Sequence, residues 1–315
     1  MRVAVLDDIH QAYDQTAGLR RLRQRAEVRI FSAPFGDPGA LRGFDALVAN
    51  RERTRFTRAL LEQLPDLRIL AQTGNHAYHI DLAAAQERGI VVAKASGGFS
   101  TGAAELAIGL TLALMRHIPA ADAAVKSGAW PSPLGRELYG KTMGIVGLGQ
   151  VGRHVARLAN AFGMRVLCSS RRPDDGSAAS AGAEPRDLDD LLRASDIVSV
   201  HASLSPATRG LLDARRLGLM KVTAFLINTA RGPIVDEAAL VAALANRRIA
   251  GAGLDVFDTE PLPSGHPLTT LPNVILTPHL GWPTDKKYED FAEAAADVLL
   301  AYLDGRDVPR FVDRH

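Results

Sequence analysis

The sequence is poor in cysteine. Cys168 is the single cysteine among 315 residues, so the chain can form no internal disulfide and no zinc site built on several cysteines. A cytoplasmic, reducing location fits this composition. The N-terminal segment also lacks the form of a signal peptide, because Asp7 and Asp8 make it acidic after only a few apolar residues.

Long apolar runs and net charge are lacking as well. The longest apolar stretch, residues 106–115, stops at Arg116 and falls short of the roughly 18 residues that a membrane-spanning helix needs. The 37 Lys and Arg residues nearly balance the 35 Asp and Glu residues, which leaves a formal net charge of +2. We therefore expect neither a nucleic acid nor a membrane surface as a partner.

Length and patterning predict two α/β domains, at roughly 150 residues per domain. Short apolar runs that read as strands alternate with longer amphipathic segments, and this alternation is typical of parallel sheets. Helices are expected at 11–25, at 103–117 and at 284–303. Leu106, Leu110, Leu114 and Ile118 would share one face of the second helix. The expected strands lie at 2–6, 28–31, 46–49, 69–71, 90–93, 142–146, 165–167, 197–200, 224–227, 253–254 and 274–276.

A glycine pattern follows the strand expected at 142–146. Gly147, Gly149 and Gly152 form G-x-G-x-x-G between an apolar strand and an amphipathic helix, which is the context that dinucleotide binding requires. Glycines allow a tight turn and close approach of the backbone to a pyrophosphate, and the helix N-terminus offers free N–H groups. The alternative is an ordinary glycine-rich turn between strand and helix.

The end of the next strand bears on the choice of nicotinamide cofactor. NAD-binding folds usually place an acid about 20 residues after the glycines, to bind the ribose 2′-hydroxyl. Here Ser170, Arg171 and Arg172 stand there instead. A hydroxyl and two guanidiniums suit a 2′-phosphate, so the sequence favours NADP. NAD remains the alternative, with both arginines as solvated loop charges.

Three polar segments each follow an apolar strand. They carry Arg231 in residues 228–232, Glu260 in residues 255–261 and His279 in residues 277–282. Ligands of doubly wound sheets bind at the carboxyl ends of the strands, so these side chains could converge on one substrate. Each residue alone is more often a surface charge, a turn residue or a structural histidine; their joint occurrence is the signal.

Four segments carry a family resemblance: GLGQVG (147–152), NTARGPIVDEAAL (228–240), GLDVFDTEP (253–261) and TPHLGW (277–282). In order and spacing they resemble the D-isomer-specific 2-hydroxyacid dehydrogenase family, which includes glyoxylate, hydroxypyruvate and D-3-phosphoglycerate enzymes. The resemblance implies two doubly wound parallel-sheet domains. A flavodoxin-like substrate domain would comprise residues 1–98 and 286–315, and a Rossmann NAD(P)-binding domain residues 99–285, with the active site in the cleft.

The resemblance also implies roles for the three polar residues. Arg231 would hold the substrate carboxylate and polarise the carbonyl. His279 would be the general acid and base, and Glu260 would hydrogen-bond its far ring nitrogen. These roles agree with the chemistry, because histidine titrates near working pH and an adjacent carboxylate favours the imidazolium.

Further contacts are implied by the same resemblance. Cofactor contacts would come from the glycine loop and from later strand ends, namely Gln150, Val151, Ala202, Thr229, Ala230 and Asp255. A turn-capping role for Asp255 is about equally plausible. Thr73, Gly74 and Asn75 match the loop whose N–H groups hold the substrate carboxylate. This loop departs from the family pattern, being longer and bearing His76 and His79, but its spacing does not suggest a metal site.

The sequence therefore predicts an NADP-leaning 2-ketoacid reductase of the glyoxylate or hydroxypyruvate type. D-3-phosphoglycerate dehydrogenase activity is one alternative, and a corepressor-like module that senses nucleotide without turnover is another. Formate enzymes of the family use Gln where this chain has Glu260, which counts against formate oxidation. A homodimer is expected, with the apolar loop around Trp130 at its interface.

Overall fold

The computed structural model describes residues 1–98, 101–170 and 176–311. The chain forms two compact units. Unit 1 comprises Met1–Ser100 and Pro283–His315, and unit 2 comprises Thr101–Trp282. Unit 1 is thus built from both ends of the chain, and unit 2 is inserted between them. The assignment of substrate to one unit and cofactor to the other stays a prediction.

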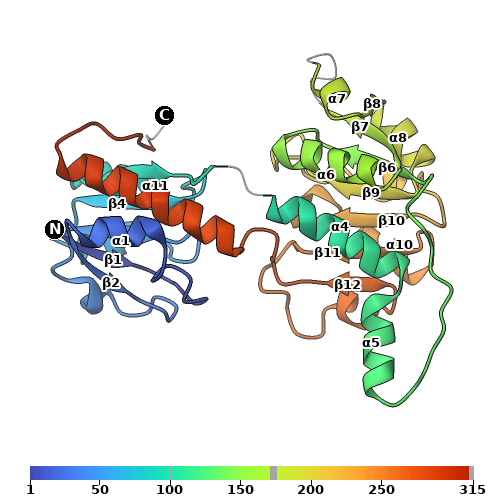
Figure 1. The fold of residues 1–315 in the computed structure, drawn as a ribbon, viewed down its shortest axis with the longest axis horizontal. Helices are drawn as coiled ribbons and strands as arrows, with labels where there is room; N and C mark the ends of the chain where they lie inside the picture. The colour runs from blue at the N-terminus through green and yellow to red at the C-terminus, as the bar shows by residue number, and fades with distance from the viewer. Residues whose placement is uncertain (99–100, 171–175, 312–315) are drawn as a thin grey trace. The chain divides into compact units, whose positions relative to one another are not determined.

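Unit 1 contains a parallel sheet in the strand order β2-β1-β3-β4-β5 (Figure 1). This order, 2-1-3-4-5, is the flavodoxin-like doubly wound arrangement. The central strands β3 and β4 are buried on both faces, which explains their nearly continuous apolar sequences, whereas the edge strand β2 is partly exposed. Their bounds are β1 Arg2–Val5, β2 Glu27–Ile30, β3 Ala46–Ala49, β4 Ile69–Thr73 and β5 Val91–Ala95.

Helices α1 (Ala17–Arg23) and α11 (Asp285–Leu303) lie against one face of this sheet (Figure 1). They approach closely because Gly18 has no side chain; a Cβ there would lie 2.3 Å from the carbonyl carbon of Ala292. Helices α2 (Arg58–Glu62) and α3 (Leu82–Glu87) pack on the other face. A short 3-10 turn, η1, spans Pro38–Leu41.

The first helix is shorter than the predicted 11–25. Asp8 accepts hydrogen bonds from the backbone N–H groups of Ala12 and Tyr13, at 2.9 and 3.1 Å, which holds that stretch in a turn. Thr16 then caps the helix by accepting from the N–H of Leu19. Side-chain capping, which period alone does not reveal, therefore sets the start of α1.

Unit 2 contains a parallel sheet in the order β12-β11-β10-β9-β6-β7-β8. From β6 the chain winds first through β7 and β8 and then back through β9 and beyond, which is the Rossmann order with one further strand. Both units thus confirm the predicted α/β class. The bounds are β6 Thr142–Val146, β7 Arg165–Ser169, β8 Glu184–Pro185, β9 Ile197–Val200, β10 Phe225–Asn228, β11 Gly251–Leu254 and β12 Val274–Leu276.

Helices cover both faces of this second sheet (Figure 1). One face packs on α4 (Gly102–Met115) and α6 (Gln150–Ala161). The other packs on α8 (Leu188–Ala194), α9 (Ala214–Leu217) and α10 (Glu237–Ala245). Three short elements lie in the connections: α7 Ser177–Ser180, η2 Gly232–Ile234 and η3 Pro267–Thr270.

The predicted helix 103–117 ends early, and Ile118 is not on its buried face. Helix α4 stops at Met115, and His117 takes a left-handed conformation with φ of 56°. Pro119 has no N–H to continue the helix, so a separate helix, α5 (Ile118–Lys126), begins there. Ile118 is 52% exposed as a result. Residues 127–141, which include the predicted loop around Trp130, contain no helix or strand.

Among the described helices, none alone has both the length and the apolar content of a membrane span, whereas α4 and α5, bent by 62°, meet those criteria as a pair.

Candidate active site

Three neighbouring strands of unit 2 end at the same edge of the sheet. The register pairs Asn228 of β10 with Leu254 of β11, and Leu254 with Leu276 of β12. The chain therefore leaves all three strands at one level. Arg231, Glu260 and His279 lie in the three loops that follow, a few residues beyond these ends.

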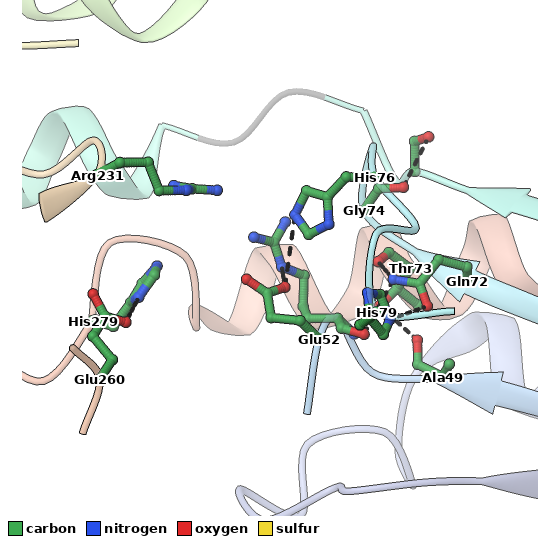
Figure 2. Close-up of polar contacts among 12 residues, drawn as sticks. Ala49, Glu52, Gln72, Thr73, Gly74, His76, His79, Arg231, Glu260 and His279 are labelled. Carbon is green, nitrogen blue, oxygen red and sulfur yellow. Dashed lines mark hydrogen bonds and ion pairs between the residues drawn. The ribbon is translucent and has the colours of Figure 1, made fainter. Parts of the chain in front are cut away.

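His279 and Glu260 form a close pair (Figure 2). Nδ1 of His279 lies 2.6 Å from Oε2 of Glu260, and Oε1 of Glu260 accepts the N–H of Phe257 at 3.0 Å. An ionised carboxylate only accepts, so Nδ1 is the donor, and Nε2 is left for another partner. Burial acts to raise the pKa of Glu260, but these hydrogen bonds and the charges of His279 and Arg231 outweigh it and hold that pKa below its usual value.

Asp255 shapes the turn that carries His279. Its carboxylate is fully buried; Oδ1 accepts from Thr277 Oγ1 at 2.6 Å and from the Leu280 N–H at 2.7 Å, and Oδ2 accepts from the Gly281 N–H at 2.9 Å. Burial nevertheless raises the pKa of Asp255. His279 itself has a positive φ of 56°, and its N–H donates to the carbonyl of Asp255. These are turn-capping contacts; an additional contact with nicotinamide stays a prediction.

The side chain of Asn228 braces the loop that presents Arg231. Its Oδ1 accepts from the N–H of Ala230, and its Nδ2 donates to the carbonyl of Arg231, both at 3.0 Å. Gly232 is needed next, because a Cβ there would lie 2.0 Å from the carbonyl carbon of Phe257. The Arg231 loop thus lies directly against the loop that leads to Glu260. In Figure 2, Arg231 and His279 extend from neighbouring loops toward the same side.

Sequence reasoning missed Asn228 and Gly232 as parts of this site. The signal was present, because Asn at the end of a strand commonly forms such a side-chain turn. The close approach that requires Gly232 joins segments 25 residues apart, and no local pattern predicts it.

A cavity of about 700 Å³ lies beside the glycine loop, where the strand order of unit 2 reverses between β6 and β9. A Cβ on Gly147 would lie 2.5 Å from the backbone N of Ala202, and one on Gly152 would lie 2.2 Å from the carbonyl oxygen of Gly147. Gly149 faces open space and precedes α6, whose N-terminus has no side-chain cap. Free N–H groups at a helix end beside open space fit the phosphates of a dinucleotide.

The cavity brings together some of the predicted cofactor residues. Gly147, Gly149, Ser170 and Ala202 line it, and Gln150, Val151 and Gly152 form the adjoining first turn of α6. Thr229, Ala230 and Asp255 follow β10 and β11 and are not among the lining residues. The predicted contacts of Arg171 and Arg172 lie outside the described residues.

His201 is a lining residue that the sequence analysis did not single out as a contact. Its Nε2 lies 2.7 Å from Ser199 Oγ, and burial lowers its pKa to about 4, so the ring is neutral at physiological pH. Ser203 and Thr208 also line the cavity, and Thr208 Oγ1 donates to the carbonyl of Ser203 at 2.7 Å. These residues supply polar groups to the wall of the cavity.

In unit 1, the candidate substrate loop follows β4. Thr73 Oγ1 accepts from the Arg51 N–H at 2.9 Å and donates to the carbonyl of Ala49 at 3.0 Å, so it joins the ends of β3 and β4. Gly74 has a φ of +95°, and the place of its missing Cβ lies 3.0 Å from the guanidinium of Arg51. Asn75, which follows, is exposed.

The two histidines of this loop have different surroundings. His79 is buried, and its Nε2 lies 3.2 Å from Oε1 of Gln72, whose Nε2 donates to the carbonyls of Arg51 and Thr73 (Figure 2). Because an amide oxygen only accepts, Nε2 of His79 is the donor, and burial lowers the pKa of the ring. His76 stacks on Tyr78 with ring centres 4.7 Å apart and lies 3.6 Å from Glu52.

No three His, Cys, Asp or Glu side chains within residues 1–98, 101–170 and 176–311 are grouped so that they could hold a metal ion.

Comparisons of this chain with known proteins find relatives by sequence and by structure that agree with one another. Residues 108–281 match the family described as D-isomer specific 2-hydroxyacid dehydrogenase, NAD binding domain. The chain is 42% identical over 310 residues to a glyoxylate reductase of Thermofilum pendens, covering 94% of this chain and 91% of that protein. It is 39% identical to D-3-phosphoglycerate dehydrogenase of Bacillus subtilis, covering 92% of this chain and 56% of that protein. The structure resembles phosphoglycerate oxidoreductase of Vibrio cholerae with a TM-score of 0.86 at 33% identity, covering 97% and 99% of the two chains.

Proposed function

The chain belongs to the D-isomer specific 2-hydroxyacid dehydrogenase family, and from this premise we propose that it is a nicotinamide-dependent reductase of small 2-ketoacids. Glyoxylate and hydroxypyruvate are the leading substrates, and the products are the corresponding 2-hydroxyacids. The glyoxylate reductases among its relatives, which match this chain over nearly their whole length, support that substrate class.

One observation carries the proposal, namely the 2.6 Å contact between His279 and Glu260 beside Arg231. Reduction of a ketoacid needs a proton donor at the carbonyl oxygen and a cation for the carboxylate. His279 and Arg231 provide these groups from adjacent loops, and Glu260 orients the ring so that Nε2 faces away from it.

The chain's own residues would act as follows. Arg231 binds the substrate carboxylate through paired hydrogen bonds, which fixes the position of the neighbouring carbonyl. A bound reduced nicotinamide supplies the hydride to C2. Nε2 of His279 gives its proton to the carbonyl oxygen as charge develops there, and Glu260 stabilises the imidazolium before that transfer.

Unit 1 would contribute a second hold on the carboxylate. Gly74 and Asn75 follow β4, and Gly74 takes a conformation that favours glycine and leaves the backbone open to close approach. We assign substrate binding to unit 1 through the backbone N–H groups of this loop, which Thr73 anchors to β3. Unit 2 would hold the cofactor at the glycine loop.

A substrate panel tests this function. Purified protein is mixed with NADPH or NADH and with glyoxylate, hydroxypyruvate, pyruvate or 3-phosphohydroxypyruvate, and absorbance at the nicotinamide band is followed. We expect turnover with the two small ketoacids. Preference for the phosphorylated substrate would instead support D-3-phosphoglycerate dehydrogenase activity, and nucleotide binding without turnover on any substrate would support a sensing module.

For the cofactor, we propose NADP over NAD. Ser170 lines the cavity directly after β7, and no Asp or Glu is among the described lining residues. Ser170→Asp places a carboxylate where a 2′-phosphate would bind, so we expect kcat/KM for NADPH to fall by about tenfold or more while that for NADH is retained. Ser170→Ala is the matched control. An unmodified enzyme that uses NADH as well as NADPH would contradict the proposal.

We also propose a homodimer formed through α5 and the loop that follows. Helix α5 has no buried residue, and Trp130 and Leu134 are 88% and 92% exposed. A second copy of the chain is the natural cover for such an apolar surface. Light scattering should give twice 33.7 kDa for the wild type and 33.7 kDa for a variant with Trp130→Ser and Leu134→Ser. Tyr78→Ser, at an aromatic residue of unit 1 that is 71% exposed, should remain dimeric.

The protein is proposed to work in the reducing cytoplasm. Its single thiol, Cys168, is buried within β7 and forms no disulfide. Fractionation of the source cells checks this, and recovery outside the cytoplasm would contradict it.

A further inference from the structure

Lys287 is a buried lysine that the catalytic chemistry does not use. It lies in the first turn of α11 and is 7% exposed. Its Nζ donates to the carbonyls of Ser96, Gly97 and Gly98, at 3.3, 2.9 and 2.9 Å. An ammonium group has three N–H donors, so these three carbonyls match its full hydrogen-bonding capacity.

The segment that Lys287 holds is closely seated on α11. Gly97 and Gly98 both have positive φ values, 61° and 65°, which turn successive carbonyls toward the ammonium group. A Cβ on Gly97 would lie 2.7 Å from the ring of Phe291 and 2.9 Å from the backbone of Asp290. Nζ of Lys287 also lies 4.3 Å from the centre of the Phe291 ring. Residues 96–98 are thus shaped to fit this turn of the helix.

The same segment contacts the candidate substrate loop. Strands β4 and β5 are paired in parallel, with Thr73 opposite Ala95, so Gly74 and Ser96 leave neighbouring strands at the same level. Ser96 Oγ donates to the carbonyl of Gly74 in a long hydrogen bond of 3.5 Å (Figure 2). A chain of contacts therefore runs from Lys287 through Ser96 to Gly74.

Lys287 and the carbonyls that it binds lie close in sequence to the two places where the chain passes between the units. Residues 96–98 come just before the passage at Ser100–Thr101, and Lys287 comes just after the return at Trp282–Pro283. One ammonium group consequently joins the unit 1 ends of both connecting segments.

We propose that Lys287 is a positioning residue for substrate binding. By holding the carbonyls of residues 96–98, it fixes Ser96 and, through Ser96, the backbone of Gly74, so that the N–H groups of the loop point toward the substrate carboxylate. The role of Gly74 rests on the proposed function; the positioning of its backbone does not.

Kinetics of Lys287→Met test the proposal, with Lys286→Met as the matched control. Lys286 is the adjacent residue, exposed and paired with Asp290, so its loss removes the same charge from the same helical turn. We expect Lys287→Met to raise the KM for glyoxylate by about tenfold, because small misplacements of binding groups have effects of this size or larger. The KM for NADPH should stay within about twofold, and Lys286→Met should match the wild type.

Hydrogen–deuterium exchange gives a readout that needs no activity. In Lys287→Met, peptides covering residues 72–80 should exchange faster than in the wild type, whereas Lys286→Met should leave them unchanged. Equal exchange in all three proteins, or an equal rise in both KM values, would overturn the proposal. If Lys287→Met does not fold, the same exchange experiment is made with Ser96→Ala. Unchanged exchange at residues 72–80 in that variant would contradict the proposal. A wild type that reduces no 2-ketoacid would refute the proposed function, and exchange would still decide the role of Lys287.

Discussion

His279 and His79 differ in the side chain that one ring nitrogen contacts: for the first it is a carboxylate, for the second an amide. In unit 2, Nδ1 of His279 meets the carboxylate of Glu260 at 2.6 Å. In unit 1, Nε2 of His79 meets the amide of Gln72 at 3.2 Å. Both lie in loops that follow parallel strands, yet only the first has an ionised partner.

The charge of the partner side chain decides which of the two histidines is suited to proton transfer. An ionised carboxylate stabilises a protonated ring, whereas a neutral amide does not. His79 is buried as well, and burial lowers its pKa. Its hydrogen bond to Gln72, which also holds the carbonyls of Arg51 and Thr73, gives it a structural part in the substrate loop.

The largest expected effect comes from making one substitution at both histidines. His279→Gln should lower kcat for ketoacid reduction by roughly 10³-fold, because it removes the proton donor. His79→Gln should change kcat by less than about tenfold, since it removes only a brace of the loop. Steady-state kinetics at saturating cofactor measure both. Comparable losses in the two variants would break the comparison.

Next in size is the effect of the carboxylate partner. Glu260→Gln preserves shape but removes the charged acceptor that orients the His279 ring, so we expect kcat to fall by about 10²-fold. Glu52→Gln, beside His76 in unit 1, is the matched control and should keep kcat within a few fold. An unchanged kcat in Glu260→Gln would argue against its role.

A smaller effect, on stability, is expected from the buried turn cap. Asp255→Asn replaces one accepting oxygen with an NH₂ group that faces a donor, so the free energy of unfolding should fall by about 1–3 kcal/mol. Asp8→Asn makes the same change at a turn of unit 1, where Asp8 accepts from Ala12 and Tyr13. Denaturant melts of both variants compare the two caps. Wild-type stability in Asp255→Asn would show that its three hydrogen bonds matter little.

The last effect is the smallest at neutral pH, because it develops only in acid. Burial lowers the pKa of His201 to about 4 from an ordinary value near 6.5, so the unfolded chain binds its proton at higher pH than the folded one. The stability that depends on neutral His201 is present above pH 6.5 and is lost as pH falls toward 4. We expect the Tm of the wild type to drop across this window and that of His201→Gln to drop less. Parallel Tm curves for the two proteins would contradict this.

Local motifs made the fold class and the catalytic candidates predictable. Alternating strands and helices indicated α/β units because the period of burial differs between the two elements. Arg231, Glu260 and His279 each stand in a short motif directly after an apolar strand, so the sequence placed them at one edge of a sheet. Their catalytic roles stay predictions until the variants are measured.

Side-chain caps, backbone turns and the pairing of strands were less predictable. The start of α1 depends on Asp8 and Thr16 capping backbone groups, and the end of α4 depends on the left-handed turn at His117. His201 was not singled out from the sequence, yet it lines the cavity because β9 lies beside β6 in the sheet.

By itself, the sequence determined where most of the strands form, although not β8, which glycines permit a tight turn, and which polar residues follow the strand ends, because these properties depend on neighbours in the chain. Only the tertiary structure decided that Asp255 caps the His279 turn, that Gly232 must admit the backbone of Phe257, and that Lys287 holds residues 96–98. Those contacts join residues tens to nearly two hundred positions apart. Their formation depends on how strands and helices pack, and no local pattern encodes that distance.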